Sequence, residues 1–124
     1  MSYHLHFELP GLPALQSKGR MHWRVAAKEE AHWKGITRTM ARPFPPKPLR
    51  RAKALFVRHS AMEPDDDNLR ASFKSIRDGL VARRPHNGHI IEDDRPAVLE
   101  AEYRWEQCER RYGYVSIDVW EVGS

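Results

Sequence analysis

The sequence has one cysteine, Cys108, and no long apolar segment. A lone thiol excludes an intrachain disulfide and any cysteine-rich zinc site. No apolar run approaches the roughly 18 to 20 residues that a membrane-spanning helix requires, so we expect no membrane partner. The first residues also lack the basic and apolar segments of a secretory signal, and we therefore expect a cytoplasmic protein.

Acidic residues are in the minority along the chain. Its 21 Lys and Arg outnumber its 17 Asp and Glu, which gives a formal net charge of +4 at pH 7. A basic balance favours polyanionic partners, either nucleic acid or an anionic membrane surface. The hydrophobic share of 40% and the charged share of 31% are typical of a globular protein, and the length suits a single domain, residues 1–124.

The spacing of apolar residues predicts alternating strands and helices. Apolar and polar side chains alternate in the expected strands, and apolar residues recur every three or four positions in the expected helices. The strands are residues 3–8, 52–59, 97–105 and 114–122, and the helices are residues 23–41 and 67–83. The order β-α-β-α-β-β predicts an α/β (α+β) fold, a small mixed sheet of about four strands with two main helices packed mainly on one face. The last two strands are expected to pair as a hairpin.

The second predicted helix has two distinct sides. With about 100° of rotation per residue, Lys74 and Asp78 lie within roughly 20° of Asp67. We expect these three residues to form a polar ridge that faces away from the core. The apolar residues on the opposite side recur at i, i+4, i+7 and i+11, and they are Leu69, Phe73, Ile76 and Leu80.

Two clusters of carboxylates stand out in this basic chain. Residues 63–68 read Glu-Pro-Asp-Asp-Asp-Asn, and residues 92–94 read Glu-Asp-Asp. Like charges this close repel one another, and a hard divalent cation would compensate, because Mg²⁺ takes oxygen ligands from carboxylates and phosphates. A turn at the helix start can bring Asp65 and Asp67 to one ion, and Asp93 or Asp94 would complete the site from a separate segment.

A metal ion held there would suit phosphodiester hydrolysis. That reaction requires a poised water, a Lewis acid on the non-bridging oxygen and charge compensation at the leaving oxygen. Lys74, as a mobile point charge, would neutralise the phosphate in the transition state. The alternative interpretation is structural, because Asp67 is a good N-cap residue and Asp-rich loops are common on protein surfaces.

The acidic clusters belong to a longer pattern. Residues 64–69 read Pro-Asp-Asp-Asp-Asn-Leu, the helix then carries Lys74 and Asp-Gly-Leu at residues 78–80, and residues 91–94 read Ile-Glu-Asp-Asp. This pattern resembles the RusA family of Holliday junction resolvases, and the likeness in element order covers most of the chain. It implies a phage-associated, Mg²⁺-dependent, homodimeric endonuclease that cuts four-way DNA junctions symmetrically in DNA recombination and repair.

The resemblance assigns roles to four carboxylates. Asp65, Asp67 and Asp94 fall on the catalytic and metal-binding positions of the family, and Asp93 is a further metal ligand beside Asp94. Mg²⁺ is the expected cofactor, and Mn²⁺ is expected to substitute for it. Branched DNA and a second copy of the chain are the expected partners.

The resemblance is less direct for the basic residues. The family's catalytic lysine usually comes three residues after the asparagine of the motif, and that position is Ala71 here. Lys74, one turn later, or Arg70 would take its role. Other basic residues are candidates for contacts with the DNA backbone, which position DNA without reading its sequence. The candidates are Lys18, Arg20, Arg24, Arg50, Arg51, Arg70, Arg83 and Arg84.

Two further interpretations stay open, and the first depends on the displacement of the family's catalytic lysine. In the first, the chain is a nucleic-acid-binding or regulatory protein on the same scaffold, and its metal site is vestigial. In the second, it is a small-molecule- or protein-binding domain with a solvated acidic loop. Cleavage of branched DNA would separate an enzyme from both.

Overall fold

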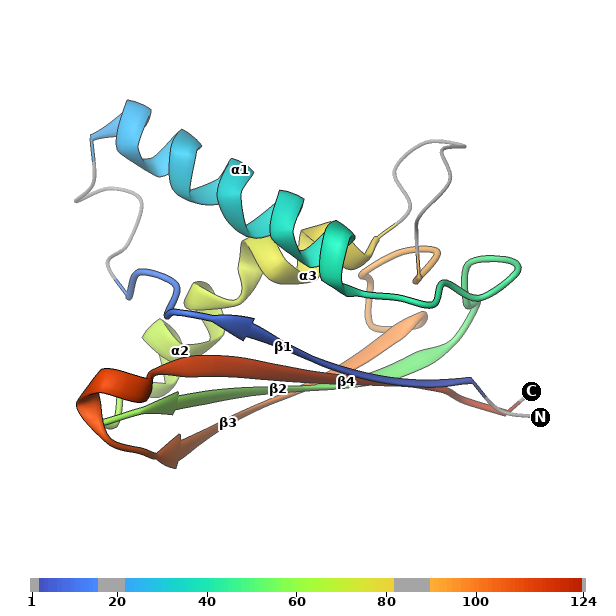
Figure 1. The fold of residues 1–124 in the computed structure, drawn as a ribbon. Helices are drawn as coiled ribbons and strands as arrows, with labels where there is room; N and C mark the ends of the chain where they lie inside the picture. Colours follow the sequence, from blue (N-terminus) through green and yellow to red (C-terminus); the bar gives the residue numbers. More distant parts are fainter. Residues whose placement is uncertain (1–2, 16–21, 82–89, 124) are drawn as a thin grey trace.

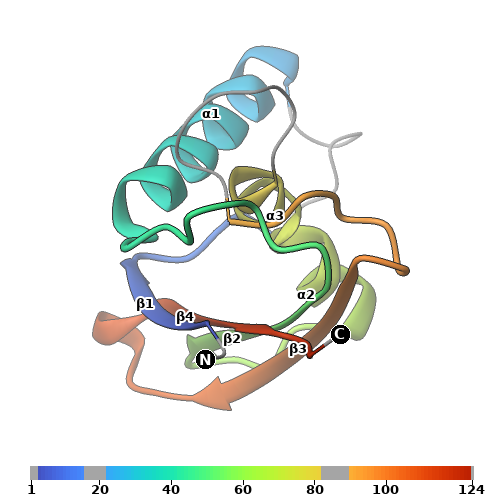
Figure 2. The same cartoon turned by 90° about the vertical axis from the view of Figure 1, so that its right-hand side faces the viewer.

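The computed structural model describes residues 3–15, 22–81 and 90–123, which form a four-stranded sheet with helices over one face (Figures 1 and 2). The predicted fold class is confirmed, and the strands lie close to their predicted positions. No helix in these described ranges is both long enough and apolar enough to cross a membrane. The elements are β1 (His4–Pro10), α1 (Trp23–Met40), β2 (Ala52–Ser60), α2 (Asp66–Ser72), α3 (Lys74–Leu80), β3 (Leu99–Gln107), the 3-10 helix η2 (Arg110–Tyr112) and β4 (Tyr114–Glu121).

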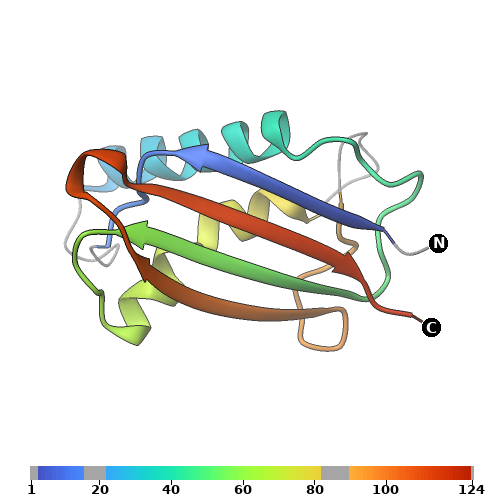
Figure 3. The ribbon, with the colours of Figure 1, turned by 60° about the horizontal axis from the view of Figure 1, so that its bottom comes forward.

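The strand order in the sheet is β1-β4-β2-β3. β4 pairs antiparallel with both β1 and β2, and β3 pairs parallel with β2 at the edge of the sheet (Figure 3). The expected hairpin between the last two strands is therefore wrong. Burial explains the order, since Val115, Ile117 and Val119 of β4 are fully buried, as suits an inner strand. β3 carries exposed charges such as Glu100 and Glu102, which protect an edge.

The helix predicted over residues 67–83 is two short helices, α2 and α3, which are separated at Phe73, and the last two residues of the prediction lie outside the described ranges. The N–H of Phe73 bonds to the carbonyl of Arg70 at 3.2 Å, in a tighter turn than an α-helix has. Ser72 Oγ donates to the Leu69 carbonyl at 2.8 Å, where it competes with the helical backbone. The predicted apolar stripe is confirmed, because all four of its residues are buried.

α1 and α3 cross at close range. A Cβ added to Gly79 would lie 2.9 Å from the Cβ of Thr37, so only a residue without a side chain allows this approach. Asp78, next to Gly79, is only 6% exposed at this crossing. The expectation that Asp78 faces away from the core is therefore wrong, because α1 covers that side of α3. Lys74 of the same ridge is exposed, as expected.

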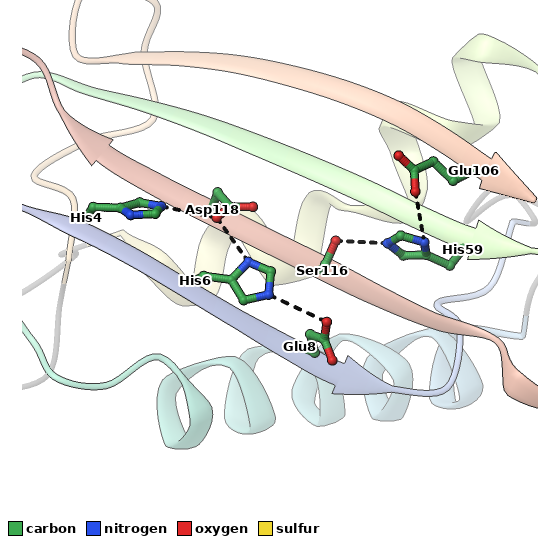
Figure 4. Close-up of polar contacts among 7 residues, drawn as sticks. All are labelled: His4, His6, Glu8, His59, Glu106, Ser116 and Asp118. Carbon is green, nitrogen blue, oxygen red and sulfur yellow. Dashed lines mark hydrogen bonds and ion pairs between the residues drawn. The ribbon is translucent and has the colours of Figure 1, made fainter. Parts of the chain in front are cut away.

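The other face of the sheet has no helix of the described ranges over it, and its side chains contact one another (Figure 4). His6 Nδ1 and His4 Nε2 lie 3.0 Å and 3.2 Å from the same oxygen of Asp118, and His6 Nε2 lies 3.5 Å from Glu8. Partial burial lowers the pKa of His6, but the hydrogen bonds and the charges of Asp118 and Glu8 outweigh it. The pKa of His6 is therefore raised above 6.5.

Candidate functional site

The first acidic cluster follows the buried strand β2 and opens α2. Asp65 is the N-cap residue: its carbonyl accepts the N–H of Leu69 at 2.8 Å, but its side chain makes no capping hydrogen bond. Asp66 and Asp67 lie in the first turn, and all three carboxylates are exposed. The N-cap is Asp65, so the expectation that Asp67 is the N-cap residue is wrong. Asp67 still lies in the first turn, where a carboxylate stabilises a helix start, so the structural interpretation stays open.

Asp65 and Asp67 have no neutralising neighbour in the part of the chain that is described. Neither side chain makes a hydrogen bond or an ion pair there. Like charges this close along the chain disfavour each other unless a cation compensates. Their oxygens are the hard ligands that Mg²⁺ prefers, so the donor chemistry of the cluster fits a divalent cation.

The second acidic cluster pairs with arginines instead. Asp94 Oδ2 lies 3.9 Å from Nε of Arg77 in α3, and Asp93 Oδ2 lies 3.3 Å from Nε of Arg95. Asp93 Oδ1 also accepts the backbone N–H of Asp94 at 2.7 Å. Within residues 3–15, 22–81 and 90–123, no three His, Cys, Asp or Glu side chains are grouped to hold a metal ion. The structure thus brings Asp94 to α3 and does not gather the predicted carboxylates.

Arg77, which the sequence pattern did not single out, links the second acidic cluster to the sheet. Its Nη1 donates a hydrogen bond to the Tyr103 hydroxyl of β3 at 2.8 Å. Its Nε is buried and makes no hydrogen bond with any described residue. The Tyr103 ring stacks on Phe56, with 5.3 Å between centroids, and the Arg70 guanidinium carbon lies 5.8 Å from the ring centre. Tyr103 therefore lies in contact with the core and with two arginines.

Helical spacing explains why these residues share one side of α2 and α3. In one continuous helix, at about 100° per residue, Asp66, Arg70 and Arg77 would lie within roughly 40° of one another. Despite the break at Phe73, Arg70 and Arg77 both contact Tyr103. That strip is separate from the ridge of Asp67 and Lys74. The spacing was a usable signal for Arg77, but nothing in the sequence shows that this side faces β3.

A pocket of about 250 Å³ lies between α2 and β3. Its charged groups are one guanidinium and two carboxylates, so it differs from a phosphate site built from cations alone. Asp66 and Arg70 both line this pocket. Its lining residues are Asp66, Leu69, Arg70, Ala101, Glu102 and Tyr103.

Lys74 lies on another side of the helix pair. Its Nζ is 4.0 Å from Asp78 Oδ2, and it lines a small pocket with Glu29, Glu30 and Trp33 of α1. Lys74 therefore faces α1, whereas the arginine strip faces β3. The two residues that would replace the family lysine thus lie on different sides, and Lys74 is the one that shares the ridge with Asp67.

The structure separates the candidate DNA-binding residues. Arg24 is exposed at the start of α1, with its guanidinium carbon 5.1 Å from the centre of the Trp23 ring. Arg50 and Arg51 are exposed just before β2, and a strand of 9 residues spans roughly 30 Å, so they lie at the opposite end of the sheet from Asp65. Arg70 lies against β3, as described above. The predicted contacts that fall outside the described residues are Lys18, Arg20, Arg83 and Arg84.

Comparison of the chain with protein-family models, with curated proteins and with solved structures finds no match. The likeness to the RusA family therefore stays a prediction that depends on the acidic motifs and the order of the elements. Function is argued below from the residues themselves.

Proposed function

We propose that this protein is a Mg²⁺-dependent, structure-selective endonuclease that hydrolyses phosphodiester bonds in four-way DNA junctions, as the resemblance to the RusA family implies. The observation that supports it best is the pair Asp65 and Asp67, which are exposed at the start of α2 without a neutralising partner among the described residues. A divalent cation would stabilise this pair, and it would join the carboxylates to a DNA phosphate.

The carboxylates have distinct parts in this proposal. Asp65 and Asp67 would hold the ion, which supplies Lewis-acid charge to the scissile phosphate. Asp94 would be a further ligand after a movement that brings it to Asp65 and Asp67, since the described residues do not group these carboxylates and its 3.9 Å contact with Arg77 is too long for a hydrogen bond. Asp93 lies next to it and makes an exposed contact with Arg95.

The basic residues would act on the DNA. Lys74 would neutralise the phosphate, since its side chain is 53% exposed and its ion pair with Asp78 is long at 4.0 Å. Arg70 would instead contact the phosphate from the side of α2 that faces β3. Arg24 would contact the backbone from the start of α1, which lies at the same end of the molecule as the start of α2 (Figure 1).

We further propose that the protein acts in the cytoplasm as a homodimer. A four-way junction is cut symmetrically when two equivalent sites face strands of the same polarity. A dimer with two-fold symmetry supplies such a pair of sites, whereas a monomer would have to bind twice.

Cleavage of synthetic DNA tests the proposal. Purified protein is incubated with a four-way junction, with a duplex and with single-stranded DNA, each with and without Mg²⁺. We expect symmetric nicking of the junction that depends on Mg²⁺ or Mn²⁺, with the duplex and the single strand cut far less. Absence of cleavage under any divalent cation would contradict the proposal.

A second function has support from one observation. Asp94 pairs with Arg77, and Lys74 lies near Asp78, so the residues assigned to catalysis are not gathered. This arrangement favours a nucleic-acid-binding protein on the same scaffold without catalytic activity. In the same experiment, this function predicts salt-sensitive binding of the junction with no cleavage.

A further inference from the structure

Three large apolar side chains are exposed at one end of the molecule. Trp23 is 69% exposed, Met62 is 75% exposed and Tyr112 is 63% exposed. Trp23 begins α1, Met62 lies between β2 and α2, and Tyr112 ends η2 between β3 and β4. These element ends all lie at the end of the molecule where α2 begins (Figures 1 and 3). We call the two aromatic residues among them, Trp23 and Tyr112, the aromatic rim.

Arginines accompany both rings of the aromatic rim. The Arg24 guanidinium carbon lies 5.1 Å from the centre of the Trp23 ring, within the range of a cation–π contact. Arg110 and Arg111 are exposed and directly precede Tyr112 in η2. Single exposed apolar residues need no explanation, but exposed rings with guanidinium groups are what single-stranded nucleic acids bind.

The backbone next to Tyr112 is anchored by the turn that follows it. The carbonyl of Gly113 accepts the N–H of Gly11 at 3.2 Å, which ties this turn to the segment after β1. A Cβ added to Gly113 would lie 2.7 Å from Cδ1 of Leu12, so the two segments are in close contact. With the backbone anchored here, only the side chain of Tyr112 has to be ordered when a base stacks on it.

We propose that Trp23 and Tyr112 of the aromatic rim stack on unpaired bases of branched or single-stranded DNA at the end of the molecule where α2 begins. The inference rests on the proposed function for its choice of DNA. Guanidinium groups next to the rings complement phosphate charge, which favours a nucleic acid over an apolar protein partner. Stacking reads the π-face that every base has, so the surface recognises unpaired bases and not a sequence.

Binding measurements test the role of the rings separately from cleavage. All variants are made in the Asp67→Asn protein, so that DNA stays intact, and affinity is measured for a labelled single strand, a matched duplex and a four-way junction. Trp23→Ala and Tyr112→Ala are each expected to weaken binding of the single strand and the junction by about tenfold or more. Duplex binding is expected to change by less than about twofold, because paired bases are not open to stacking.

Two control variants separate the loss of stacking from the loss of any exposed apolar side chain. Val25→Ala removes an exposed apolar side chain two residues further along α1, where Val25 is 54% exposed, and is expected to leave affinity unchanged. Trp23→Phe keeps a ring and is expected to retain most of the affinity. Fluorescence of Trp23, measured as the signal lost in Trp23→Phe, is expected to be quenched by the single strand.

The two proposals fail in different ways. If the Ala variants bind the single strand and junction as tightly as their parent, or if the parent binds neither, the stacking role is overturned. An equal loss for all three ligands would also overturn it, since the rings would then contribute only general affinity. If the protein cleaves the junction and the rim variants bind as their parent does, the nuclease proposal holds and the stacking proposal fails. If the rim variants weaken binding and the protein does not cleave, the stacking proposal holds and the nuclease proposal fails.

Discussion

Arg77 donates a hydrogen bond to the Tyr103 hydroxyl at 2.8 Å, and the same guanidinium lies 3.9 Å from Asp94. One side chain of α3 therefore joins the edge strand β3 to the loop that carries the second acidic cluster. The contact places Asp94 next to α3.

Loss of the Tyr103 hydroxyl should destabilise the fold. In Tyr103→Phe the ring still packs on Phe56, but the partly buried guanidinium of Arg77 loses its hydrogen-bond acceptor, at a cost of about 1 to 3 kcal/mol. Urea unfolding measures this change. Tyr112→Phe is the matched control, because Tyr112 is exposed, and it is expected to change stability by less than about 0.5 kcal/mol. Equal stability of the two variants would contradict the role given to Arg77.

Substitution by alanine is expected to lower the stability of the protein at one helical glycine and to raise it at another. Gly79→Ala places a Cβ 2.9 Å from Thr37 and 3.1 Å from the carbonyl of Lys34, so we expect a loss of about 1 to 3 kcal/mol. Gly35→Ala meets nothing within 4 Å and is expected to stabilise α1 by about 0.5 to 1 kcal/mol. Thermal unfolding of both variants checks the sign. A stabilising Gly79→Ala would show that α1 and α3 do not cross as described.

The uncovered face of the sheet should make stability depend on pH. The pKa of His6 is raised in the folded protein, so its interaction with Asp118 and Glu8 is fully present below the unfolded pKa of about 6.5 and is lost as pH rises through the folded pKa. His6→Gln should therefore destabilise the protein more near pH 5.5 than near pH 8.5, by less than about 1 kcal/mol because the pair is partly exposed. In an Asp118→Asn background the pH dependence of this effect should shrink, and an unchanged difference would contradict the contact.

Much of the fold could be predicted from the sequence because strand and helix periods are local properties. The alternation in residues 52–59 indicates a strand, in which Phe56 and Arg58 lie two positions apart and so on one side, and both are buried in β2. The strand order could not be predicted in this way. It depends on which strand buries most surface in the complete sheet, and the position of β4 between β1 and β2 reflects the burial of residues such as Ile117.

The candidate site could be predicted in part for the same reason. Asp65 and Asp67 were placed at a helix start from their position before an apolar stripe, and α2 begins between them. The pairing of Arg77 with Tyr103 could not be predicted, because these residues are 26 positions apart and meet only when α3 packs near β3. The burial of Asp78 likewise depends on the crossing of α1 and α3.

The nuclease proposal is tested most directly by nicking of a synthetic four-way junction in the presence of Mg²⁺, with two variants of the same helical turn. Asp67→Asn removes a proposed metal ligand, whereas Asp66→Asn changes a carboxylate that lines the pocket against β3. We predict that Asp67→Asn abolishes nicking and leaves junction binding intact or improved, while Asp66→Asn still cuts. Full cleavage by Asp67→Asn, or equal loss in both variants, would contradict the proposed metal site.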